Sequence, residues 1–528
     1  MSYVAVTTFI TSDGANICTP FRADLATLIP HARSLDYQGQ RMLVLPNRHD
    51  EAKLARNLGV HIPAPILTRY NWCNHANPPW DIQRTTAALV SESHRAFVLS
   101  TMGTGKTRSV LYAADFLIKE GRAKRILVSA PLSTLTPVWE DELFGRFPHL
   151  RRRVLYGSRA QRIKLLAEDA DVFIVNHHGV HMLRDELAAR GFDIVIVDEI
   201  AVLRNKGTQL WKAHNAIIAP AKFAWGLTGS PTPVAPTDAW AQCKLLVPGT
   251  VARSFTQFQD QTMRRLSQFK WIARPDANDT VHRAMQPSVR FTRDDIAELP
   301  PTSYVNRTVQ LEPQAQRAYD MLFDKMSTLT SAGDTITAAN EGVLQNKLLQ
   351  VACGYIYTDM MNGEKQVYAL PNAARLTALD ETVAETDRKV IVFVPFVHAL
   401  EGVVTHLRGQ GHDVEAVHGA VSRGKRDAIF RGFQHGTSPR IIVAHPQCMA
   451  HGLTLTAANV IVWYAPTQSL EIYEQANARI VRPGQTAKTL IAHLYGTPVE
   501  RVTYARLRAR GSMQGLLLAL FRQQELVF

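Results

Sequence analysis

Residues 97–107 combine a short apolar run, a glycine-rich turn and a Lys-Thr pair that opens a helical pattern. Glycines let backbone N–H groups approach phosphate oxygens closely, and a helix N-terminus favours the negative charge there. Lys106 is expected to reach the β- and γ-phosphates of a nucleotide, and the Thr107 hydroxyl is expected to bind the accompanying metal ion. Ser100 replaces the first glycine of the usual pattern, and the segment alone is also compatible with an ordinary turn. The positions predicted to surround the phosphates are Met102, Gly103, Thr104, Gly105, Lys106, Thr107 and Arg108.

A second set of reactive residue types is the pair Asp198 and Glu199, which ends an apolar run over residues 192–197. Such a run predicts a buried strand, and open parallel α/β sheets bind ligands at the carboxyl ends of their strands. Asp198 is predicted to hold Mg²⁺ through its water shell, and Glu199 to orient or deprotonate the water that attacks the γ-phosphate. A strand that simply meets solvent is the alternative. The upstream phosphate loop favours the catalytic interpretation.

A third set is Arg479 and Arg482, whose spacing puts them on one face if the segment is helical. Two guanidinium groups on one face suit a phosphate that is being transferred, because arginine stays charged and bonds in a bidentate manner. An isolated pair of this kind is equally typical of a solvated basic helix end. Together with the first two sets, the pair predicts these catalytic residues: Lys106, Asp198, Glu199, Arg479 and Arg482.

The elements that must position these residues occur in two copies. Apolar runs alternate with helical patterns over residues 85–245 and again over 375–500, which predicts βα units and parallel sheets. The intervening segment lacks the strand rhythm and has helical stretches at 314–328 and 338–351. Before the first copy, residues 40–46 and 49–58 predict a strand and a helix of a small α+β module. The expected domains are 1–75, 76–250, 251–370, 371–500 and a brace helix over 501–528.

Taken in order, these segments resemble the superfamily-two helicases and, within them, the Swi/Snf-type DNA translocases. The resemblance runs from about residue 78 to 507. In the first half it rests on Gln83, on residues 126–133 with Trp139, on residues 172–176, on the Leu-Thr-Gly-Ser-Pro of 227–231, and on residues 291–301. In the second half it rests on residues 389–393, on 417–419 with Arg426 and Phe433, on 451–461, and on the arginine pair with Gly484-Gln485.

The resemblance implies two RecA-like lobes that hold ATP and Mg²⁺ between them, preceded by the small α+β module. Gln83 would read adenine, and Gly452 would join the nucleotide site from the second lobe. Thr228 belongs to the motif that couples the nucleotide site to the nucleic-acid site. The positions implied to contact nucleic acid are Pro131, Ser133, Asn176, His418, Gly419 and Thr454. The module also resembles the HARP-type substrate-recognition domain of annealing and branch-migration helicases.

Three departures from the family pattern affect coupling more than hydrolysis. Ser100-Thr101 stands where Asp-Glu usually precedes the phosphate loop, and Ile200-Ala201 stands where Ala-His usually follows the two carboxylates. Tyr464-Ala465-Pro466 replaces the usual Trp-Asn-Pro. These changes indicate a divergent lineage, such as a bacteriophage one.

Composition agrees with a globular protein that binds a polyanion. The chain has 528 residues, 46% of them hydrophobic, and a net charge of +13 spread along its length. The five cysteines form no C-x-x-C pair, so we expect reduced thiols rather than zinc ligands, including at Cys73 near His75. No apolar run is long enough to span a membrane, and no signal peptide is evident, so we expect a cytoplasmic protein of a bacterial cell or a phage-infected host.

The function predicted is ATP-dependent translocation on duplex DNA, without sequence preference, that remodels branched structures by fork regression, branch migration or annealing. Replication or recombination proteins are the expected further partners. Three alternatives stay open: an RNA helicase, a motor that strips proteins such as polymerase from DNA, and a DNA-binding scaffold with an inactive motor. The Gly484-Gln485 ending argues against the RNA helicase, and retention of the catalytic residues argues against the scaffold.

Overall fold

The computed structural model describes residues 7–72, 78–266, 271–292, 295, 300–331, 338–359, 365–449, 454–482 and 484–508. Within the described residues, the chain forms two compact units, one over residues 7–295 and one over residues 300–508. Some predicted features lie outside the described residues: Cys73 with His75, positions 293–294 and 296–299 of the linker motif, Gly452, and residues 509–528 of the brace.

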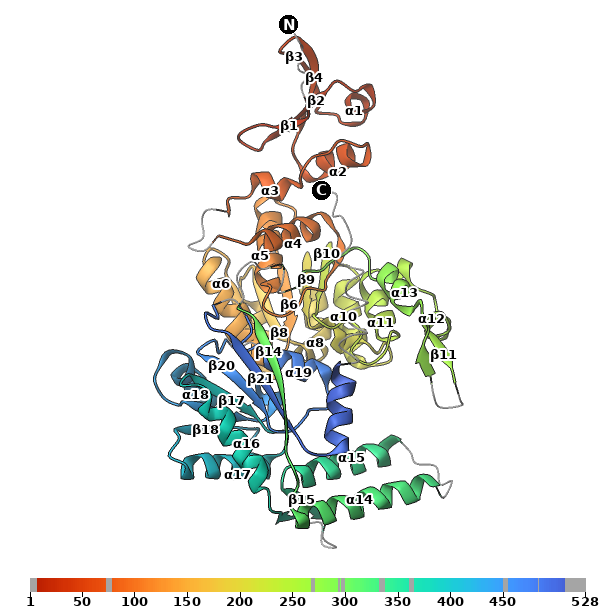
Figure 1. The fold of residues 1–528 in the computed structure, drawn as a ribbon. Coiled ribbons are helices and arrows are strands. Elements are labelled where there is room, and N and C mark those ends of the chain that lie inside the picture. The colour runs from red at the N-terminus through yellow and green to blue at the C-terminus, as the bar shows by residue number, and fades with distance from the viewer. Residues whose placement is uncertain are drawn as a thin grey trace. The chain divides into compact units, whose positions relative to one another are not determined.

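The first unit begins with a small module over residues 7–62 (Figure 1). Its antiparallel strands have the order β1-β2-β4-β3. The strand and helix predicted for this region are β4 and α2. The elements are β1 (Phe9–Ile10), β2 (Asn16–Pro20), α1 (Ala23–Leu28), β3 (Arg33–Tyr37), β4 (Gln40–Pro46) and α2 (His49–Asn57). The module has its own hydrophobic core, built from Ile17, Leu25, Ile29, Leu43, Leu45, Ala52, Ala55, Val60 and Ile62.

The segment after this core belongs to the next domain. Helix α3 (Pro65–Arg69) and its flanks bury Ala64, Ile66, Tyr70 and Trp72 in the hydrophobic core of the first large sheet. Tyr70 donates a hydrogen bond of 2.5 Å to the buried Asp115 carboxylate. The change of core therefore falls near residue 63, earlier than the expected boundary at residue 75.

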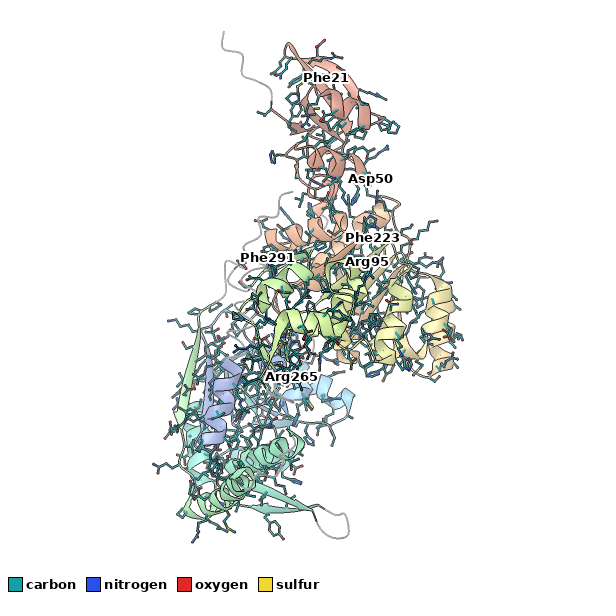
Figure 2. The ribbon with its side chains drawn as sticks, turned by 90° about the vertical axis from the view of Figure 1, so that its right-hand side faces the viewer. Phe21, Asp50, Arg95, Phe223, Arg265 and Phe291 are labelled. Atoms are coloured by element: carbon teal, nitrogen blue, oxygen red, sulfur yellow. The ribbon has the colours of Figure 1, made fainter. Side chains whose placement is uncertain are left out.

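Ion pairs join the module and the α3 segment to the first lobe. Asp50 pairs with Arg122 at 3.0 Å, and Arg56 pairs with Glu92. Arg69 pairs with Glu120 at 2.6 Å and also donates to the backbone carbonyl of Asn47 in the module. Figure 2 labels Asp50 on α2 and Phe21 further into the module. The module is thus held by polar contacts at residues outside its own core.

The first large sheet has seven strands in the order β13-β5-β10-β9-β6-β8-β7, all of them parallel. The strands are β5 (Arg95–Val98), β6 (Ile126–Ala130), β7 (Arg152–Leu155), β8 (Val172–Asn176), β9 (Ile194–Asp198), β10 (Phe223–Leu227) and β13 (Ser288–Val289). The side chains of β6, β9 and β10 are buried throughout. This explains why near-continuous apolar runs predicted them. Figure 2 labels Arg95 and Phe223 where β5 and the neighbouring β10 begin.

Helices connect these strands as the βα pattern predicted. They are α4 (Asp81–Glu92), α5 (Lys106–Lys119), α6 (Asp141–Arg146), α7 (Arg159–Ala167), α8 (His177–Met182), α9 (Arg184–Arg190), α10 (Gln209–Ile218) and α11 (Asp238–Leu246). A further subdomain comes next, with α12 (Phe255–Thr262), β11 (Met263–Arg265), β12 (Trp271–Ala273) and α13 (Ala277–Ala284). The chain then returns to the sheet as β13, which is too short to give a periodic signal.

The second unit contains a six-stranded parallel sheet in the order β14-β21-β20-β17-β19-β18. The strands are β14 (Thr302–Thr308), β17 (Lys389–Phe393), β18 (Val414–Val417), β19 (Ile441–Ala444), β20 (Ala458–Trp463) and β21 (Thr489–Tyr495). The helices α16 (Ala373–Ala384), α17 (Val397–Gly409), α18 (Arg423–His435) and α19 (Leu470–Asn477) accompany it. The two parallel-sheet α/β lobes predicted from the sequence are thereby confirmed. Strand β14 was not predicted, because it is an edge strand with mostly exposed side chains.

Between β14 and α16, the predicted helical stretches are α14 (Pro313–Ser331) and α15 (Ala338–Ala352). They are followed by the hairpin of β15 (Tyr355–Asp359) and β16 (Lys365–Ala369). Tyr319 of α14 packs against Leu348 and Val351 of α15 in a small separate core. Residues 499–508 include a helical stretch, the described part of the predicted brace.

Candidate nucleotide and nucleic-acid sites

The glycine-rich segment forms the turn between β5 and α5. Gly103 has φ 86° and Gly105 has φ 77°. Both angles lie in the left-handed region of backbone conformation, which residues with a Cβ atom rarely adopt. Lys106 is the first residue of α5, and its Nζ donates to the carbonyl oxygens of Ser100 at 2.8 Å and Thr101 at 3.3 Å. The side chain of Lys106 therefore packs against the glycine-rich loop that is predicted to bind phosphate.

Ser100, which replaces the first glycine of the usual phosphate-loop pattern, has a structural role. The Ser100 hydroxyl accepts a hydrogen bond of 2.9 Å from the Phe291 backbone N–H, and Thr101 donates to the Phe291 carbonyl at 2.9 Å. Arg290 donates from Nη1 to the Leu99 carbonyl at 2.7 Å. Segment 288–291, which includes β13 and Phe291 (Figure 2), thus extends the sheet to the edge of the loop. The sequence did not reveal this contact, because its partners lie far apart in the chain.

Gln83 lies directly against the phosphate loop. It is buried on α4, its Oε1 accepts from the Trp80 backbone N–H at 3.1 Å, and a Cβ added at Gly105 would lie 2.0 Å from its Nε2. This Nε2 has no hydrogen-bond partner among the described residues. An unpartnered buried amide is unfavourable. A nucleobase that accepts a hydrogen bond there fits the predicted role of Gln83.

The two carboxylates differ in their surroundings. Asp198 ends β9, is buried, and accepts hydrogen bonds from Trp139 Nε1 at 3.0 Å and from the Glu199 backbone N–H at 3.1 Å. Burial raises the pKa of the Asp198 carboxyl, and the hydrogen bond from Trp139 and the charge of Lys106 oppose this rise. Lys106 and Asp198, predicted from distant stretches of sequence, therefore lie within electrostatic reach of each other. The role of Trp139 as a partner of Asp198 was not predicted.

Glu199 comes next, with an unusual backbone, φ 49° and ψ 53°. A left-handed conformation is uncommon for a residue with a long side chain, and such strain often marks functional sites. Its Oε2 accepts a hydrogen bond of 3.1 Å from the Thr228 hydroxyl, which in turn accepts from the Ser230 backbone N–H at 3.1 Å. The Thr-Gly-Ser-Pro segment thus contacts the predicted base directly.

The other predicted phosphate-loop positions are divided between the loop and its surroundings. The Thr104 hydroxyl donates to the Thr101 carbonyl at 2.8 Å and so tightens the turn. Arg108 pairs with Glu142 on α6 through its Nε at 2.5 Å, which points to a structural role beside any contact with nucleotide. Thr107 lies in the first turn of α5, next to Lys106. The Thr107 hydroxyl and the Asp198 carboxylate are hard oxygen donors, a set that fits Mg²⁺ bound together with substrate phosphates.

The predicted nucleic-acid positions of the first unit lie where neighbouring strands end. Pro131 and the exposed Ser133 follow β6, and Asn176 ends β8. Arg162 holds the Asn176 side chain, donating to Oδ1 at 2.8 Å. The pairing of β6 with β8 brings Ala130 beside Asn176. The structure therefore gathers these positions on one edge of the sheet.

A buried Ser-His-His cluster lies just inside that edge. Ser129 Oγ is 2.8 Å from His177 Nδ1 and 2.8 Å from His214 Nε2. His214 Nδ1 lies 2.8 Å from the Leu210 carbonyl and must donate to it, so the Ser129 hydroxyl donates to His214 and accepts from His177. Burial lowers the pKa of His214 to about 4, which keeps it neutral. The cluster ties β6 and the start of α8 to α10.

The predicted arginine pair lies in the second unit, beyond the end of α19 at Asn477. The expected helical turn is instead a series of tight turns, in which Arg479 N–H donates to the Ala476 carbonyl at 3.1 Å and Arg482 N–H donates to the Ile480 carbonyl at 3.1 Å. Arg479 is buried, and its Nε donates to the Gln475 carbonyl at 2.8 Å. Both arginines therefore lie in turns after the end of the helix.

Gln485, the last residue of the motif that carries the arginine pair, has a structural role. Its buried side chain donates from Nε2 to the carbonyls of Ala458 at 2.7 Å and Ile480 at 3.3 Å, and its Oε1 accepts from the Ala487 backbone N–H at 3.0 Å. Gly484 precedes it with φ 94°. Gln485 therefore fastens the arginine-bearing turn to the start of β20.

The remaining predicted positions of the second unit lie next to strands. His418 and the exposed Gly419 follow β18, and the exposed Thr454 precedes β20. Phe433, which was part of the family spacing, is a buried core residue. Tyr464 and Ala465, at the departure from Trp-Asn-Pro, are buried directly after β20.

Comparison with known proteins agrees with this architecture. The model of the SNF2-related domain matches residues 86–353, and the helicase conserved C-terminal domain matches residues 374–484. The chain belongs to the SNF2-related family, as the resemblance of its motifs predicted. At this level the predicted enzyme class, an ATP-dependent helicase or translocase that acts on DNA, is confirmed.

Individual relatives are distant. A protein of Acyrthosiphon pisum secondary endosymbiont phage 1 is 28% identical over 81% of this chain and 95% of its own length. An ATP-dependent helicase of Mycoplasma pneumoniae is 22% identical over 73% of this chain and 36% of its own length. The SWI/SNF-related matrix-associated actin-dependent regulator of chromatin subfamily A-like protein 1 of Drosophila melanogaster is 23% identical over 76% and 51%. The chain thus spans about half or less of the last two proteins.

Among solved structures, the Sulfolobus solfataricus SWI2/SNF2 ATPase core in complex with dsDNA is 21% identical, with 86% of this chain and 97% of that chain covered and a TM-score of 0.41. In the described part of this chain, no helix is both long and apolar enough to cross a bilayer.

Proposed function

We propose that this protein is an ATP-driven translocase on double-stranded DNA that remodels branched DNA. The family supports the motor activity. The observation that carries the branched-DNA assignment is the N-terminal module, which has its own core and presents aromatic and basic side chains to solvent. We propose the cytoplasm of a bacterial or phage-infected cell as its setting, in keeping with the phage relative.

In the first unit, Gln83 of α4 and residues at or after the ends of β5, β9 and β10 would act on ATP. Gln83 would bind the adenine, and Lys106 would neutralise charge that develops on the transferred phosphate. Glu199, oriented by the Thr228 hydroxyl, would position and deprotonate the attacking water. Thr107 and Asp198 would hold Mg²⁺, which supplies positive charge to the phosphates.

We further propose that hydrolysis requires Arg479 and Arg482 of the second unit. Neither unit alone supplies all predicted catalytic groups, so ATP turnover would be linked to movement of one unit against the other. Such closure and opening is a common way for conformational change to drive a motor.

DNA contacts would be made through the sugar-phosphate backbone at Pro131, Ser133, Asn176, His418, Gly419 and Thr454. Contacts with phosphates carry no sequence information, so binding would show little sequence preference and a steep dependence on salt. The net charge of +13 supports association with a polyanion.

The exposed surface of the module supports a role in choosing branched structures. Strand β3 is exposed along its whole length, including Arg33, Leu35 and Tyr37. The Tyr37 ring lies against Phe9 with ring centroids 5.8 Å apart, although both side chains remain exposed. Exposed aromatic rings beside basic groups are typical of surfaces on which unpaired bases stack. Forks offer such bases where their strands separate, and four-way junctions offer them when a base pair at the branch point opens.

The test compares the full chain with a variant that lacks residues 1–62. The cut falls after Ile62 because Ala64, Ile66, Tyr70 and Trp72 belong to the core of the motor lobe. We expect ATPase activity on linear duplex to persist while conversion of labelled forks and four-way junctions falls at least about tenfold. Both are measured at one salt concentration, since affinity varies steeply with salt. Equal junction conversion by both proteins would refute the role of the module.

A finer variant tests the aromatic surface itself. Replacing Phe9 and Tyr37 by alanine should lower junction conversion roughly five- to a hundredfold, the range expected for lost base stacking. The matched control replaces Leu28, an exposed residue on α1, by alanine and should behave as the parent protein. If the control and the aromatic variant lose the same activity, the stacking surface is wrong.

A further inference from the structure

A cavity of about 540 Å³ lies in the second unit, where three parallel strands end. Its walls come from the loop after β17, the loop after β19, the loop after β20, and the helices α15 and α19. Figure 1 labels β17, β20, α15 and α19 in the second unit. Ligands of parallel α/β sheets bind at the carboxyl ends of strands, and the volume falls within the range of about 300–1,000 Å³ usual for small-molecule sites.

The lining has a distinctive chemical composition. Four carboxamide side chains contribute to it, those of Asn346, Gln350, Gln447 and Gln468. Lys347 contributes a positively charged side chain to the lining. Phe396 is half-buried, because it packs against the core of the sheet and also lines the cavity. No carboxylate occurs among the described residues that line this cavity. The cavity therefore suits a ligand that is planar, rich in hydrogen-bonding edges and negatively charged.

The rim of the cavity is held by the protein itself. His445 lies with Nε2 3.1 Å from the Pro395 carbonyl, so the ring joins the loop after β19 to the loop after β17. The buried Arg375 donates from Nη1 to the Tyr464 carbonyl at 2.5 Å and pairs with the buried Glu500 at 2.8 Å. The Tyr464 carbonyl immediately precedes Ala465-Pro466, where the third loop begins. These contacts pre-form the three loops.

The topology of the two sheets indicates which ligand the cavity suits. Without β13, the first sheet has the order β5-β10-β9-β6-β8-β7, and the second has β14-β21-β20-β17-β19-β18. In chain order these are the same arrangement, so β17 and β19 correspond to β6 and β8. The ends of β6 and β8 carry Pro131 and Asn176, which we assign to nucleic-acid contacts. The equivalent ends in the second sheet carry Phe396 and His445 and open into the cavity.

We propose that this cavity binds one unpaired nucleotide of DNA. The carboxamides would pair with the edge of the base, as glutamine and asparagine do with adenine. Phe396 would stack on the base, and Lys347 would neutralise a flanking phosphate. The inference rests on the proposed action on DNA and adds to it a preference for DNA that contains an extrahelical base. A free nucleoside monophosphate has the same chemistry, so the experiment must separate the two sources.

The experiment uses the full chain and three probes that contain 2-aminopurine. One is a duplex with a single unpaired 2-aminopurine, the second is the same duplex with that base paired, and the third is the free nucleoside monophosphate. We expect the protein to bind the bulged duplex more tightly than the paired one and to change the fluorescence of the unpaired base. Replacing Phe396 by alanine should reduce the preference roughly five- to a hundredfold. Gln314→Ala, an exposed position on α14 outside the cavity, is the matched control and should keep it.

Two results overturn the proposal. Equal affinity of the parent protein for bulged and paired duplex would show that the cavity does not bind an unpaired nucleotide of DNA. Displacement of the bulged DNA by a similar concentration of the free monophosphate would show that the cavity binds a free nucleotide instead. If Phe396→Ala unfolds, Gln447→Ala with Gln468→Ala replaces exposed rim residues and must lower the preference. ATPase activity on paired duplex is recorded in parallel. Its absence in the parent refutes the proposed motor function, whereas its presence without a preference for the bulge refutes the cavity assignment alone.

Discussion

The two parallel sheets of this protein share one strand order but differ in the residues at the carboxyl ends of their strands. In the first sheet, β5 leads into a glycine-rich loop and β9 ends in Asp198 and Glu199. In the second, the equivalent β14 is followed by a segment without glycine, and the equivalent β20 is followed by Tyr464 and Ala465. The same scaffold therefore carries, in one lobe, an edge with the residues proposed to act on phosphates and, in the other, a cavity whose described lining residues include no carboxylate.

This difference teaches that the chemistry of each lobe depends on a few residues at strand ends. The sheets themselves contribute buried apolar positions, which are interchangeable in kind. Polar groups at the strand ends are held by contacts from distant parts of the chain, such as the Thr228 hydroxyl on the Glu199 carboxylate and the Arg375 guanidinium on the Tyr464 carbonyl. The comparison predicts that substitutions at the first edge affect hydrolysis most, and that the second unit contributes through its arginines.

The largest effect is expected at the phosphate loop. Lys106→Ala should lower ATP turnover by at least about a hundred- to thousandfold, because the transferred phosphate loses a fixed positive charge. Glu199→Gln should block turnover to a similar extent but retain bound ATP. Steady-state hydrolysis and nucleotide retention on a filter measure the two effects. Lys164→Ala, an exposed lysine on α7, is the control, and near-native turnover by either site variant would place the reaction elsewhere.

The next effect would come from the second unit. Arg482→Ala or Arg479→Ala should slow hydrolysis by about a hundredfold or more, as loss of an arginine finger does, while ATP affinity changes much less. Arg501→Ala, an exposed arginine of the same unit, serves as the control. A fragment that ends at Pro300 should bind ATP and hydrolyse it barely. Vigorous DNA-stimulated hydrolysis by that fragment would mean that the first unit is sufficient.

A smaller effect is expected at the hydrogen bond between Thr228 and Glu199. Thr228→Val removes a donor to a carboxylate, an interaction of about 1.5–3 kcal/mol, and should lower kcat roughly ten- to a hundredfold with little change in KM for ATP. Thr228→Ser keeps the hydroxyl and should restore most of the rate. A change confined to KM would show that this contact serves binding and not the orientation of Glu199.

The smallest effect is expected at the base-reading position. Gln83→Glu keeps the acceptor for the Trp80 N–H but loses the buried amide donor, so KM for ATP should rise several-fold while kcat stays nearly constant. The preference for ATP over GTP should shrink in the same variant. Unchanged discrimination between the two nucleotides would remove Gln83 from the adenine site.

The sequence predicted the two α/β lobes and the phosphate loop because both depend on local signals, namely apolar runs and glycine next to Lys-Thr. It also predicted which strand ends carry Asp198 and Asn176. It did not predict the hydrogen bond from the Phe291 N–H to the Ser100 hydroxyl, the hydrogen bond from Trp139 to Asp198, or the packing of Gln83 against Gly105. Each of these contacts joins distant parts of the chain. The polar edge strand β14 gave no apolar signal.

Two local expectations also differ from the structure for physical reasons. The arginine pair was expected on a helical turn, but α19 ends before it, and the tight turns that carry the pair are held by hydrogen bonds from the Gln485 side chain to Ile480 and to the distant Ala458. The N-terminal boundary was expected at residue 75. Sequence polarity changes little across residues 60–75, and only the packing of Ile62 and Ala64 into different cores separates the two domains.

The change of hydrophobic core between Ile62 and Ala64 affects how motors of this kind can exchange their N-terminal domain. Because one hydrophobic core ends at Ile62 and the next begins at Ala64, recombination at this point would exchange the whole module without opening either core. Polar contacts cross this boundary, namely ion pairs such as Asp50 with Arg122 and hydrogen bonds such as that from Arg69 to the Asn47 carbonyl. Such contacts tolerate remodelling better than interlocked apolar side chains. In a lineage under rapid genetic exchange, a single recombination event would therefore replace the N-terminal module and leave both motor lobes unchanged.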